Sequence, residues 1–277
     1  MNTAAAVDVI IVNYNAGDLL RQCVDSVLAS EDVIVRCVVV DNASTDGSLA
    51  FAAGPAGSDE RLVVIRNPDN LGFAVAVNQG ATQGAGDWFL LLNPDARVEP
   101  DTLARLLAEA QGLPQAGALG PLILNPDGSE QRGCRRDLPK PVDVLLQALQ
   151  LHRLSPRFDF NHNRRPLPEL TVPVAAISGA CMLVRRQAHE QLGGFDEGFF
   201  LHFEDLDYCA RLQEQQWQVY FAPAVRIEHV QGSCSQQNPQ QINRFKGAGM
   251  RRYFARHPAG QLLLLPLLRL LLRVRGW

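Results

Sequence analysis

The sequence predicts an α/β protein in which a mostly parallel, Rossmann-like sheet is flanked by helices and followed by a C-terminal helical tail. Short β-branched runs alternate with helical patterns through the first half of the chain. This alternation is typical of parallel strands joined by covering helices. The run WFLLL at 88–92 is apolar throughout, which indicates a strand buried on both faces of the sheet.

The expected elements follow in order along the chain. In the first half we expect strands at 7–13, 33–41, 61–66 and 87–93, and helices near 17–29, from 73 and at 101–112. Residues 117–131 predict a strand followed by a turn at 125–128, where the sequence Asn-Pro-Asp-Gly favours a turn. Further on we expect a pair of strands within 171–186 and helices near 185–191 and from about 204 to 216. Residues from about 133 to 170 are irregular and rich in arginine, and we interpret them as a long loop or a helical insertion.

The composition is that of an ordinary globular protein, with 277 residues, 47% of them apolar and 20% charged. Six cysteines lack any CxxC pair or zinc spacing, which favours a reducing, cytoplasmic compartment. The N-terminus lacks the pattern of a signal peptide, and we interpret it as leading into a first strand. The formal net charge of −3 gives no reason to expect a nucleic-acid partner.

The C-terminus is a basic tail on a mildly acidic body, because no acidic residue follows Glu228. Within the tail, the leucine-rich run 262–272 is shorter than the roughly 20 residues that a membrane span requires. Two alternatives stay open for it. The tail could lie on a membrane surface as a peripheral contact, or it could pack in a homo-oligomer.

Polar residues follow each expected strand of the first half. The first strand leads to Asn13-Tyr14-Asn15 and not to a GxGxxG turn, which argues against a nicotinamide or flavin dinucleotide site. Since ligands of open α/β sheets lie outside the carboxyl ends of the strands, we expect the polar ends to converge on one crevice. These ends are Asn13-Tyr14-Asn15, Asp41-Asn42, Arg66-Asn67 and Asn93-Pro94-Asp95.

One of these ends and a loop further along the chain could bind a nucleotide. Asp41 could accept a hydrogen bond from a pyrimidine N3–H, with Asn42 beside it, although Asp41 or Ser44 could instead cap a following helix. The loop Asn70-Leu71-Gly72, with Asn78 further into the next helix, could approach a ribose or diphosphate through backbone N–H groups. A plain turn would have the same sequence.

The segment Asn93-Pro94-Asp95 follows a buried strand that is aimed at the crevice. It ends in an oxygen ligand suited to Mg²⁺ or Mn²⁺ bridging a diphosphate, although the same three residues also form ordinary turns. His229, at the end of the run VRIEH, could be a surface imidazole or a metal ligand. We hypothesise that His229 pairs with Asp95.

An acidic cluster, Glu204, Asp205 and Asp207, begins a helical pattern. Acidic residues in a first helical turn often only complement the helix dipole. Here, however, they lie among Phe199, Phe200, Phe203 and Tyr208, and apolar surroundings can raise a carboxyl pKa toward the range useful for a general base.

In this order the motifs closely resemble glycosyltransferase family 2, and within it the bacterial rhamnosyltransferase branch. The resemblance covers about residues 7 to 232 and rests on VIIVNYN, VVVDNASTDGS, RNPDNLGFAVAVNQG, FLLLNPD, SGACMLVRR, GGFDEGFFLHFEDLDYCARL and the later His229. It implies a GT-A fold and inversion at the anomeric carbon of the sugar.

The resemblance also implies roles for individual residues. Asp205 would be the catalytic base, with Glu204 and Asp207 as orienters or sugar contacts, and Asp95 and His229 would hold Mg²⁺ or Mn²⁺. The nucleotide-sugar would be bound by Asn13, Asn15, Asp41, Asn42, Asn70, Gly72, Asn78 and Asn93. Asn93 stands where the commonest pattern has the first aspartate of an Asp-x-Asp motif, and this asparagine is typical of the rhamnosyltransferase-like branch.

The expected reaction moves L-rhamnose from dTDP-L-rhamnose to a glycan or lipid-linked acceptor in cell-surface polysaccharide synthesis. UDP-galactofuranose and UDP-N-acetylglucosamine are alternative donors. A nucleotidyltransferase is less favoured, because the first strand is not followed by a glycine- and lysine-rich phosphate loop. A non-catalytic sugar-nucleotide-binding protein is a further alternative. We expect the transferase domain over 1–235, divided at about 130 between donor-binding and acceptor-binding parts, and an extension over 236–277.

Overall fold

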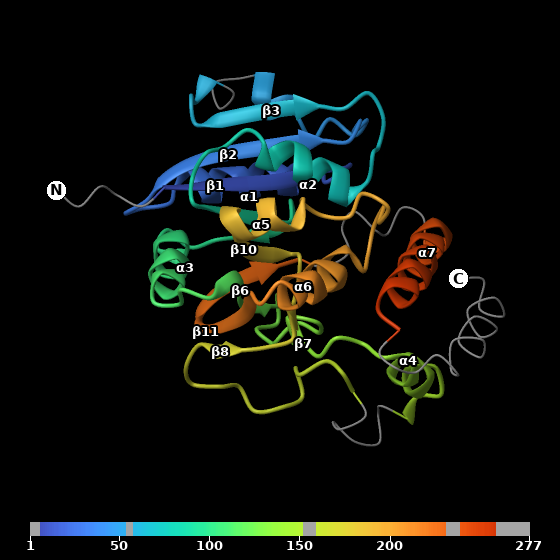
Figure 1. Cartoon of the computed structure of the whole chain (residues 1–277). Coiled ribbons are helices and arrows are strands. Elements are labelled where there is room, and N and C mark those ends of the chain that lie inside the picture. The colour runs from blue at the N-terminus through green and yellow to red at the C-terminus, as the bar shows by residue number, and fades with distance from the viewer. Residues whose placement is uncertain (1–5, 54–57, 152–158, 231–238, 259–277) are drawn as a thin grey trace.

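A nine-stranded mixed sheet forms the centre of the computed structural model, which describes residues 6–53, 58–151, 159–230 and 239–258 (Figure 1). The strand order is β3-β2-β1-β4-β10-β6-β11-β5, with β8 paired to β11. β10 is antiparallel to both of its neighbours, whereas β1 to β4 run parallel and β11 runs parallel to β6. The strands are β1 (Ala6–Asn13), β2 (Ile34–Asp41), β3 (Leu62–Arg66), β4 (Trp88–Leu92), β5 (Ala96–Arg97), β6 (Ala116–Leu124), β8 (Val172–Pro173), β10 (Cys181–Arg185) and β11 (Gln218–His229). The predicted mostly parallel α/β fold is confirmed.

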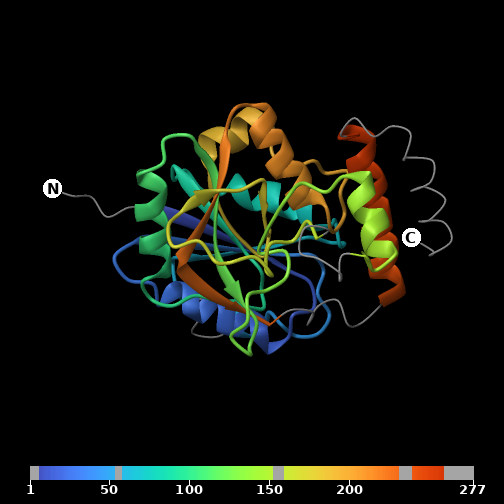
Figure 2. The same cartoon turned by 90° about the horizontal axis from the view of Figure 1, so that it is seen from below.

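Helices cover both faces of the sheet because alternate strand residues point to opposite sides (Figure 2). Val9 and Ile11 pack with helices α1 (Asp18–Leu28) and α3 (Thr102–Gln111), whereas Ile10 packs on the opposite face. That second face is covered by α2 (Phe73–Ala81), α5 (Arg186–Leu192) and α6 (Glu204–Glu214). In α1 the buried residues recur at helical spacing, which presents one apolar stripe to the sheet: Leu20, Cys23, Val24 and Val27.

The arginine-rich segment contains a helix, which the sequence allowed, and also a short strand, which it did not indicate. Its short strand β7 (Arg135–Arg136) pairs antiparallel with β9 (Ala176–Ile177), and helix α4 (Pro141–Ala148) follows. The expected pair of strands within 171–186 is instead three short pieces, β8, β9 and β10. β8 ends at Pro173, whose nitrogen cannot donate to a sheet ladder. A short 3₁₀ helix, η1 (Ala50–Ala53), lies between β2 and β3.

Helix α7 (Pro239–Arg256) packs on the outer side of the turn that precedes α6, which is the segment 193–203 between α5 and α6. Its Met250, Tyr253 and Phe254 join the apolar core that includes α6. Gly249 lies where an added Cβ would be 2.4 Å from the backbone oxygen of His202. Arg252 and Arg256 on the same helix pair with Asp196 at 2.7 and 3.1 Å. Apolar burial and ion pairs therefore both hold α7 against this turn.

None of the helices in the described ranges is long and apolar enough to cross a membrane. The expected helices of the first half are confirmed as α1, α2 and α3, and the later ones as α5 and α6. The leucine-rich run 262–272 and Cys234 lie outside the described residues. The other five cysteines are buried as free thiols.

Gly249→Ala tests the close packing of α7. In a helix interior this change alone stabilises a protein by about 0.5–1 kcal/mol. Here the added methyl meets backbone that cannot move aside, so we expect a net loss of about 1–3 kcal/mol in the free energy of unfolding. Urea denaturation measures it, and a gain in stability would contradict the docking of α7.

Candidate active site

The carboxyl ends of β1 and β2 form one hydrogen-bonded network. Asn13 pairs with Asp41 in the sheet register, and its amide Nδ2 lies 2.6 Å from Asp41 Oδ1 and within 3 Å of the Ser44 and Ser48 hydroxyls. The second oxygen of Asp41 accepts the backbone N–H of Ser44. Both Asn13 and Asp41 are buried. Asp41 is thus a fixed carboxylate at the sheet edge, where its remaining lone pairs can accept an N–H.

The loop after β2 closes over this network. The backbone N–H of Asn15 donates to the Ser44 hydroxyl, and Asn15 Oδ1 accepts the N–H of Thr45. The alternative that Asp41 or Ser44 caps a following helix is wrong, because only bends and turns separate β2 from η1 at Ala50.

A second network joins the β2 loop to the start of α2. Asn42 Nδ2 donates to the carbonyl of Gly72, and Asn67 donates to Asn42 Oδ1. Asn70 Oδ1 accepts the N–H of Gly72. Gly72 has φ of 87°, and an added Cβ would lie 2.7 Å from the Phe200 oxygen, so glycine is required here both for its backbone conformation and for space. The structure therefore brings together Asn42, Asn70 and Gly72.

Asn78, on α2, contacts the chain segment between α5 and α6. Its Nδ2 donates to the carbonyl of Phe195 and to Glu197, and its Oδ1 accepts the N–H of Phe195. With both ends of its amide engaged, Asn78 holds the chain that leads into α6. Its expected nucleotide contact stays a prediction.

The candidate metal ligands lie at the ends of β4 and β11. His229 Nε2 is 2.9 Å from Asp95 Oδ1 and 3.2 Å from the amide nitrogen of Asn93. Both Asp95 and His229 are buried, at 7% and 5% exposure. The hypothesised proximity of Asp95 and His229 is thus present in the structure, with Asn93 in contact with the same imidazole.

Gln131 orients the imidazole and was not singled out from the sequence. Its amide nitrogen donates to Asn125 Oδ1 and to the carbonyl of His229, so its oxygen faces His229 Nδ1 at 2.7 Å. Nδ1 must therefore carry a proton, while Nε2 faces Asp95 Oδ1. A nitrogen and an oxygen lone pair at 2.9 Å repel, so this contact requires a second proton or a cation between the two atoms. A divalent ion fits this pair, and the fixed tautomer is the one that metal-bound histidines use.

Asp205 is linked to this pair through the start of β10. The N–H of Asn93 donates to the carbonyl of Ala180 at 2.9 Å, and the N–H of the preceding Gly179 donates to Asp205 Oδ2 at 3.2 Å. Asp205 also accepts the N–H of Leu206 and forms an ion pair with Arg136 from β7. The sequence shows Arg136 only as one residue of the arginine-rich segment. No pattern near β7 indicates that the Arg136 side chain reaches α6.

The other two carboxylates of the cluster have different surroundings. Glu204 is buried, and desolvation together with the nearby Asp205 raises its pKa to about 8. Asp207 is fully buried and pairs with Arg211 at 2.7 Å and with His257 at 2.9 Å. Because His257 follows α7, these contacts give Asp207 an anchoring role, and its expected sugar contact stays a prediction.

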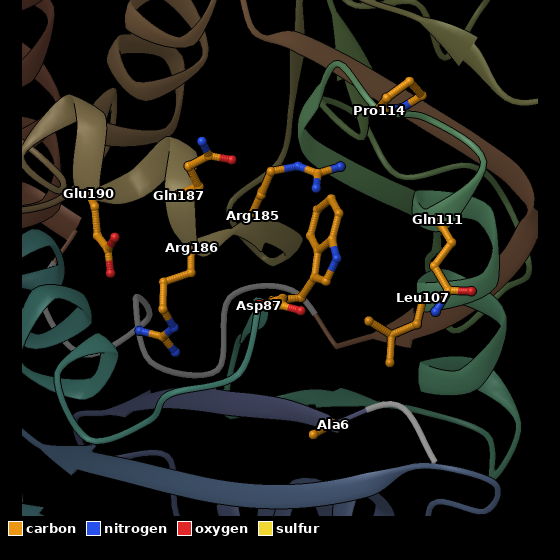
Figure 3. Close-up of a pocket in the computed structure, with 10 residues that line it drawn as sticks. Ala6, Asp87, Leu107, Gln111, Pro114, Arg185, Arg186, Gln187 and Glu190 are labelled. Carbon is orange, nitrogen blue, oxygen red and sulfur yellow. The ribbon is translucent and has the colours of Figure 1, made fainter. Parts of the chain in front are cut away.

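A cavity of about 610 Å³ lies at the opposite edge of the sheet (Figure 3). It is lined by Ala6 and Trp88, the first residues of β1 and β4, and by Arg185 and Arg186. Both arginine side chains donate hydrogen bonds to backbone carbonyls, and Arg186 also forms an ion pair with Asp8. The cavity is therefore at the amino ends of the parallel strands, away from the polar network of the carboxyl ends.

Comparison with known proteins defines the class. The model of glycosyl transferase family 2 matches residues 8–193. An N-acetylglucosaminyl-diphospho-decaprenol L-rhamnosyltransferase of Mycobacterium tuberculosis is 32% identical over 247 residues, which cover 83% of this chain and 78% of that protein. The chain belongs to glycosyltransferase family 2.

Solved structures support the GT-A fold. A mannosyltransferase of Pyrobaculum calidifontis in complex with GDP-Man and Mn²⁺ superposes with a TM-score of 0.61 at 18% identity, covering 93% of this chain and 65% of that one. GalNAc-T7 with UDP, GalNAc and Mn²⁺ gives 0.62 at 17% identity, covering 93% and 51%. The chain thus spans about two thirds and about half of these two proteins, and the likeness shows the fold.

Gln131→Met tests the orientation of His229. Methionine removes the acceptor that fixes Nδ1–H, and loss of such a partner weakens metal binding by about 10- to 100-fold. Titration calorimetry with Mn²⁺ and a nucleoside diphosphate measures the affinity without turnover. Gln83→Met, on an exposed residue, is the matched control, and equal affinity of both variants would contradict the role of Gln131.

Glu204→Gln tests the burial of Glu204. A carboxyl whose pKa rises to about 8 on folding binds a proton that the unfolded chain releases near pH 4.5, so the native protein loses stability as pH rises through this window. Glutamine does not ionise, so the variant does not lose stability in this way. We expect the Tm of the variant minus the Tm of the wild type to increase from pH 5 to pH 8.5. The exposed substitution Glu169→Gln should show no such trend. A difference that does not change with pH would refute the raised pKa.

Proposed function

We propose that this chain is an inverting, metal-dependent glycosyltransferase that moves a sugar from a nucleoside diphosphate to an acceptor hydroxyl. One observation carries the proposal. Asn93, whose amide contacts the His229 imidazole, donates its backbone N–H to the Ala180 carbonyl, and the adjacent Gly179 donates its N–H to the Asp205 carboxylate. A site for the leaving diphosphate and a base for the acceptor are thereby held at fixed separation, as one displacement step requires.

The donor side is assigned to the loops after β1, β2 and β3. Asp41 is the group that accepts an N–H from the base, and Asn13 and Asn15 hold the loop that surrounds it. Asn70 and Gly72 shape the loop before α2, and the dipole at the start of that helix favours phosphate. Asn42 ties this loop to the Asp41 loop.

Asp95 and His229 are assigned as protein ligands of Mg²⁺ or Mn²⁺, with Asn93 beside them. The ion would act as a Lewis acid that stabilises the negative charge developing on the departing diphosphate. Gln131 keeps the His229 imidazole in the tautomer that presents Nε2 to the ion. Diphosphate oxygens and water, which Mg²⁺ commonly retains, would supply the remaining ligands.

Asp205 is assigned as the base that accepts the proton of the acceptor hydroxyl. Its ion pair with Arg136 and the Gly179 N–H fix its orientation. Glu204 is the weaker choice, because its raised pKa leaves it protonated at pH 7. A single base and the absence of a covalent step lead to inversion, so a β-linked donor sugar gives an α-linked product.

The donor sugar is assigned as L-rhamnose from dTDP-L-rhamnose, supported by the 32% identity to the mycobacterial L-rhamnosyltransferase. UDP-galactofuranose and UDP-N-acetylglucosamine are the competing donors. The acceptor is a glycan or lipid-linked saccharide of surface polysaccharide synthesis, at the cytoplasmic face of the membrane. The basic tail would supply the peripheral contact or a homo-oligomer interface.

Asp205→Asn separates an enzyme from a protein that only binds the nucleotide-sugar. The amide cannot take a proton, so we expect kcat to fall by about 10²- to 10⁴-fold, while donor affinity measured by calorimetry stays within about twofold. Exposed Asp101→Asn serves as the control. Transfer at the wild-type rate by Asp205→Asn, in an assay with candidate nucleotide sugars and Mn²⁺, would overturn the assignment.

A further inference from the structure

Arg136 reaches the assigned base from a backbone that is held on both edges. Its strand β7 pairs with β9, and an isolated bridge joins Arg136 to Asn161 on the other edge. Alternate strand residues point to opposite sides. Arg135 accordingly forms an ion pair with Glu130, whereas Arg136 forms its ion pair with Asp205 at the start of α6. The Arg136 guanidinium is thus presented to Asp205 from a fixed backbone.

The ion pair between Arg136 and Asp205 uses only part of the guanidinium edge that can contact a carboxylate. In the neighbouring pair, Arg135 Nε and Nη2 donate to the two oxygens of Glu130, which is the usual bidentate arrangement. Arg136 donates to Asp205 through Nη2. Its Nε is buried and has no hydrogen-bond partner in the described part of the chain. One N–H donor beside the ion pair is therefore unused.

The Asp205 carboxylate has a matching unused position. A carboxylate offers about four lone-pair sites for hydrogen bonds. Oδ2 of Asp205 accepts from Arg136 Nη2 and from the N–H of Gly179, and Oδ1 accepts from the N–H of Leu206. These contacts with described residues leave one lone pair, on Oδ1. The ion pair therefore has one N–H donor and one lone pair still to be satisfied.

A hydroxyl group is the ligand that satisfies both. Its oxygen carries one O–H donor and two lone pairs, so it can donate to Asp205 Oδ1 and accept from Arg136 Nε at the same time. An anion would be repelled by the Asp205 carboxylate, and an ammonium group would offer no lone pair to Arg136. The two side chains are 16% and 14% exposed, so a hydroxyl can approach the ion pair from solvent.

We propose that Arg136 is a catalytic residue whose Nε–H binds the attacking oxygen of the acceptor. This inference rests on the proposed transferase function. A small rotation of the guanidinium about its Nη2 contact brings Nε–H to the entering hydroxyl, whose proton passes to Asp205 Oδ1. The electron pair of the broken O–H bond stays on the oxygen, which forms the bond to the anomeric carbon. The bond from that carbon to the diphosphate breaks, and its electron pair leaves with the diphosphate.

The contact with Arg136 favours the transition state over the bound substrate. The attacking oxygen gains negative charge as its proton leaves, so the hydrogen bond that it accepts from Nε–H becomes stronger. Asp205 removes the proton, and Arg136 stabilises the charge that remains on the oxygen. The expected effect of Arg136 is therefore on kcat, with little effect on the binding of the nucleotide-sugar.

Arg136→Lys and Arg136→Met test this role. Lysine keeps a positive charge beside Asp205 but lacks the second donor of the planar fork, whereas methionine removes both. We expect each variant to lose about 10- to 100-fold in kcat. The KM for the nucleotide-sugar should stay within about twofold, because only the contact with the attacking oxygen is lost. If Arg136 only orients Asp205, the lysine variant should instead keep most of the activity.

Release of the nucleoside diphosphate measures kcat with two kinds of acceptor. Methyl glycosides of hexoses and N-acetylhexosamines supply sugar hydroxyls, and water supplies the attacking oxygen when the nucleotide-sugar is hydrolysed. Arg105→Lys is the matched control, because exposed Arg105 on α3 also contacts an aspartate through one N–H. Activity of Arg136→Lys close to that of the wild type would overturn the proposal.

The Nε–H resonance of Arg136 tests the contact without turnover. It is the ¹⁵N–¹H signal that Arg136→Lys lacks. In the complex of the wild type with Mn²⁺ and the nucleoside diphosphate, titration with the methyl glycosides should move this signal downfield, because the hydroxyl oxygen then accepts the proton. A signal that stays in place with every glycoside would overturn the contact, even where sugar is transferred. A wild type that neither transfers nor hydrolyses any nucleotide-sugar would count against the proposed function instead.

Discussion

The backbone contact between Phe200 and the first turn of α2 is the constraint on which the site depends. The N–H of Phe73 donates to the Phe200 carbonyl at 2.8 Å, and only glycine at 72 leaves room for that approach. The loop assigned to the donor phosphates and the turn that carries the assigned base are thereby fixed to each other. Asn78 strengthens the same junction through Phe195.

Helix α7 supports that turn from outside, and the turn is strained. His202 and Phe203 have φ of 69° and 73°, values that non-glycine residues seldom adopt. Gly249 lies against the His202 carbonyl, and Asp207 on α6 pairs with His257 just beyond α7. The strain is maintained because packing on both sides allows no other conformation. Residues of α7 and the residue that follows it therefore help to hold the assigned base in place.

Much of the fold could be predicted from the sequence, and so could the polar network at the carboxyl ends of the strands. Parallel strands end at one edge of the sheet, so the polar residues that follow them must lie together there. The pairing of Asp95 and His229 could be stated as a hypothesis. Gln131 and Arg136 could not, since each reaches the site through a chain reversal that no local pattern encodes. Asp207 shows the opposite difficulty. Its place in the acidic cluster suggests chemistry, although Arg211 lies one helical turn further along the predicted helix, and only the structure shows that His257 pairs with it as well. Helical periodicity cannot tell which carboxylate faces a ligand and which faces another helix.

The central claim is a single displacement, with Asp205 as the base and the diphosphate held on the opposite side of the sugar. The anomeric configuration of the product tests this claim most directly. It is read by ¹H and ¹³C NMR from the one-bond C1–H1 coupling, after transfer from the nucleotide-sugar that the wild type accepts. The account predicts inversion, so that a β-linked L-rhamnosyl donor yields the α-linked product. Retention of the donor configuration would exclude a single displacement from the opposite face and would contradict it.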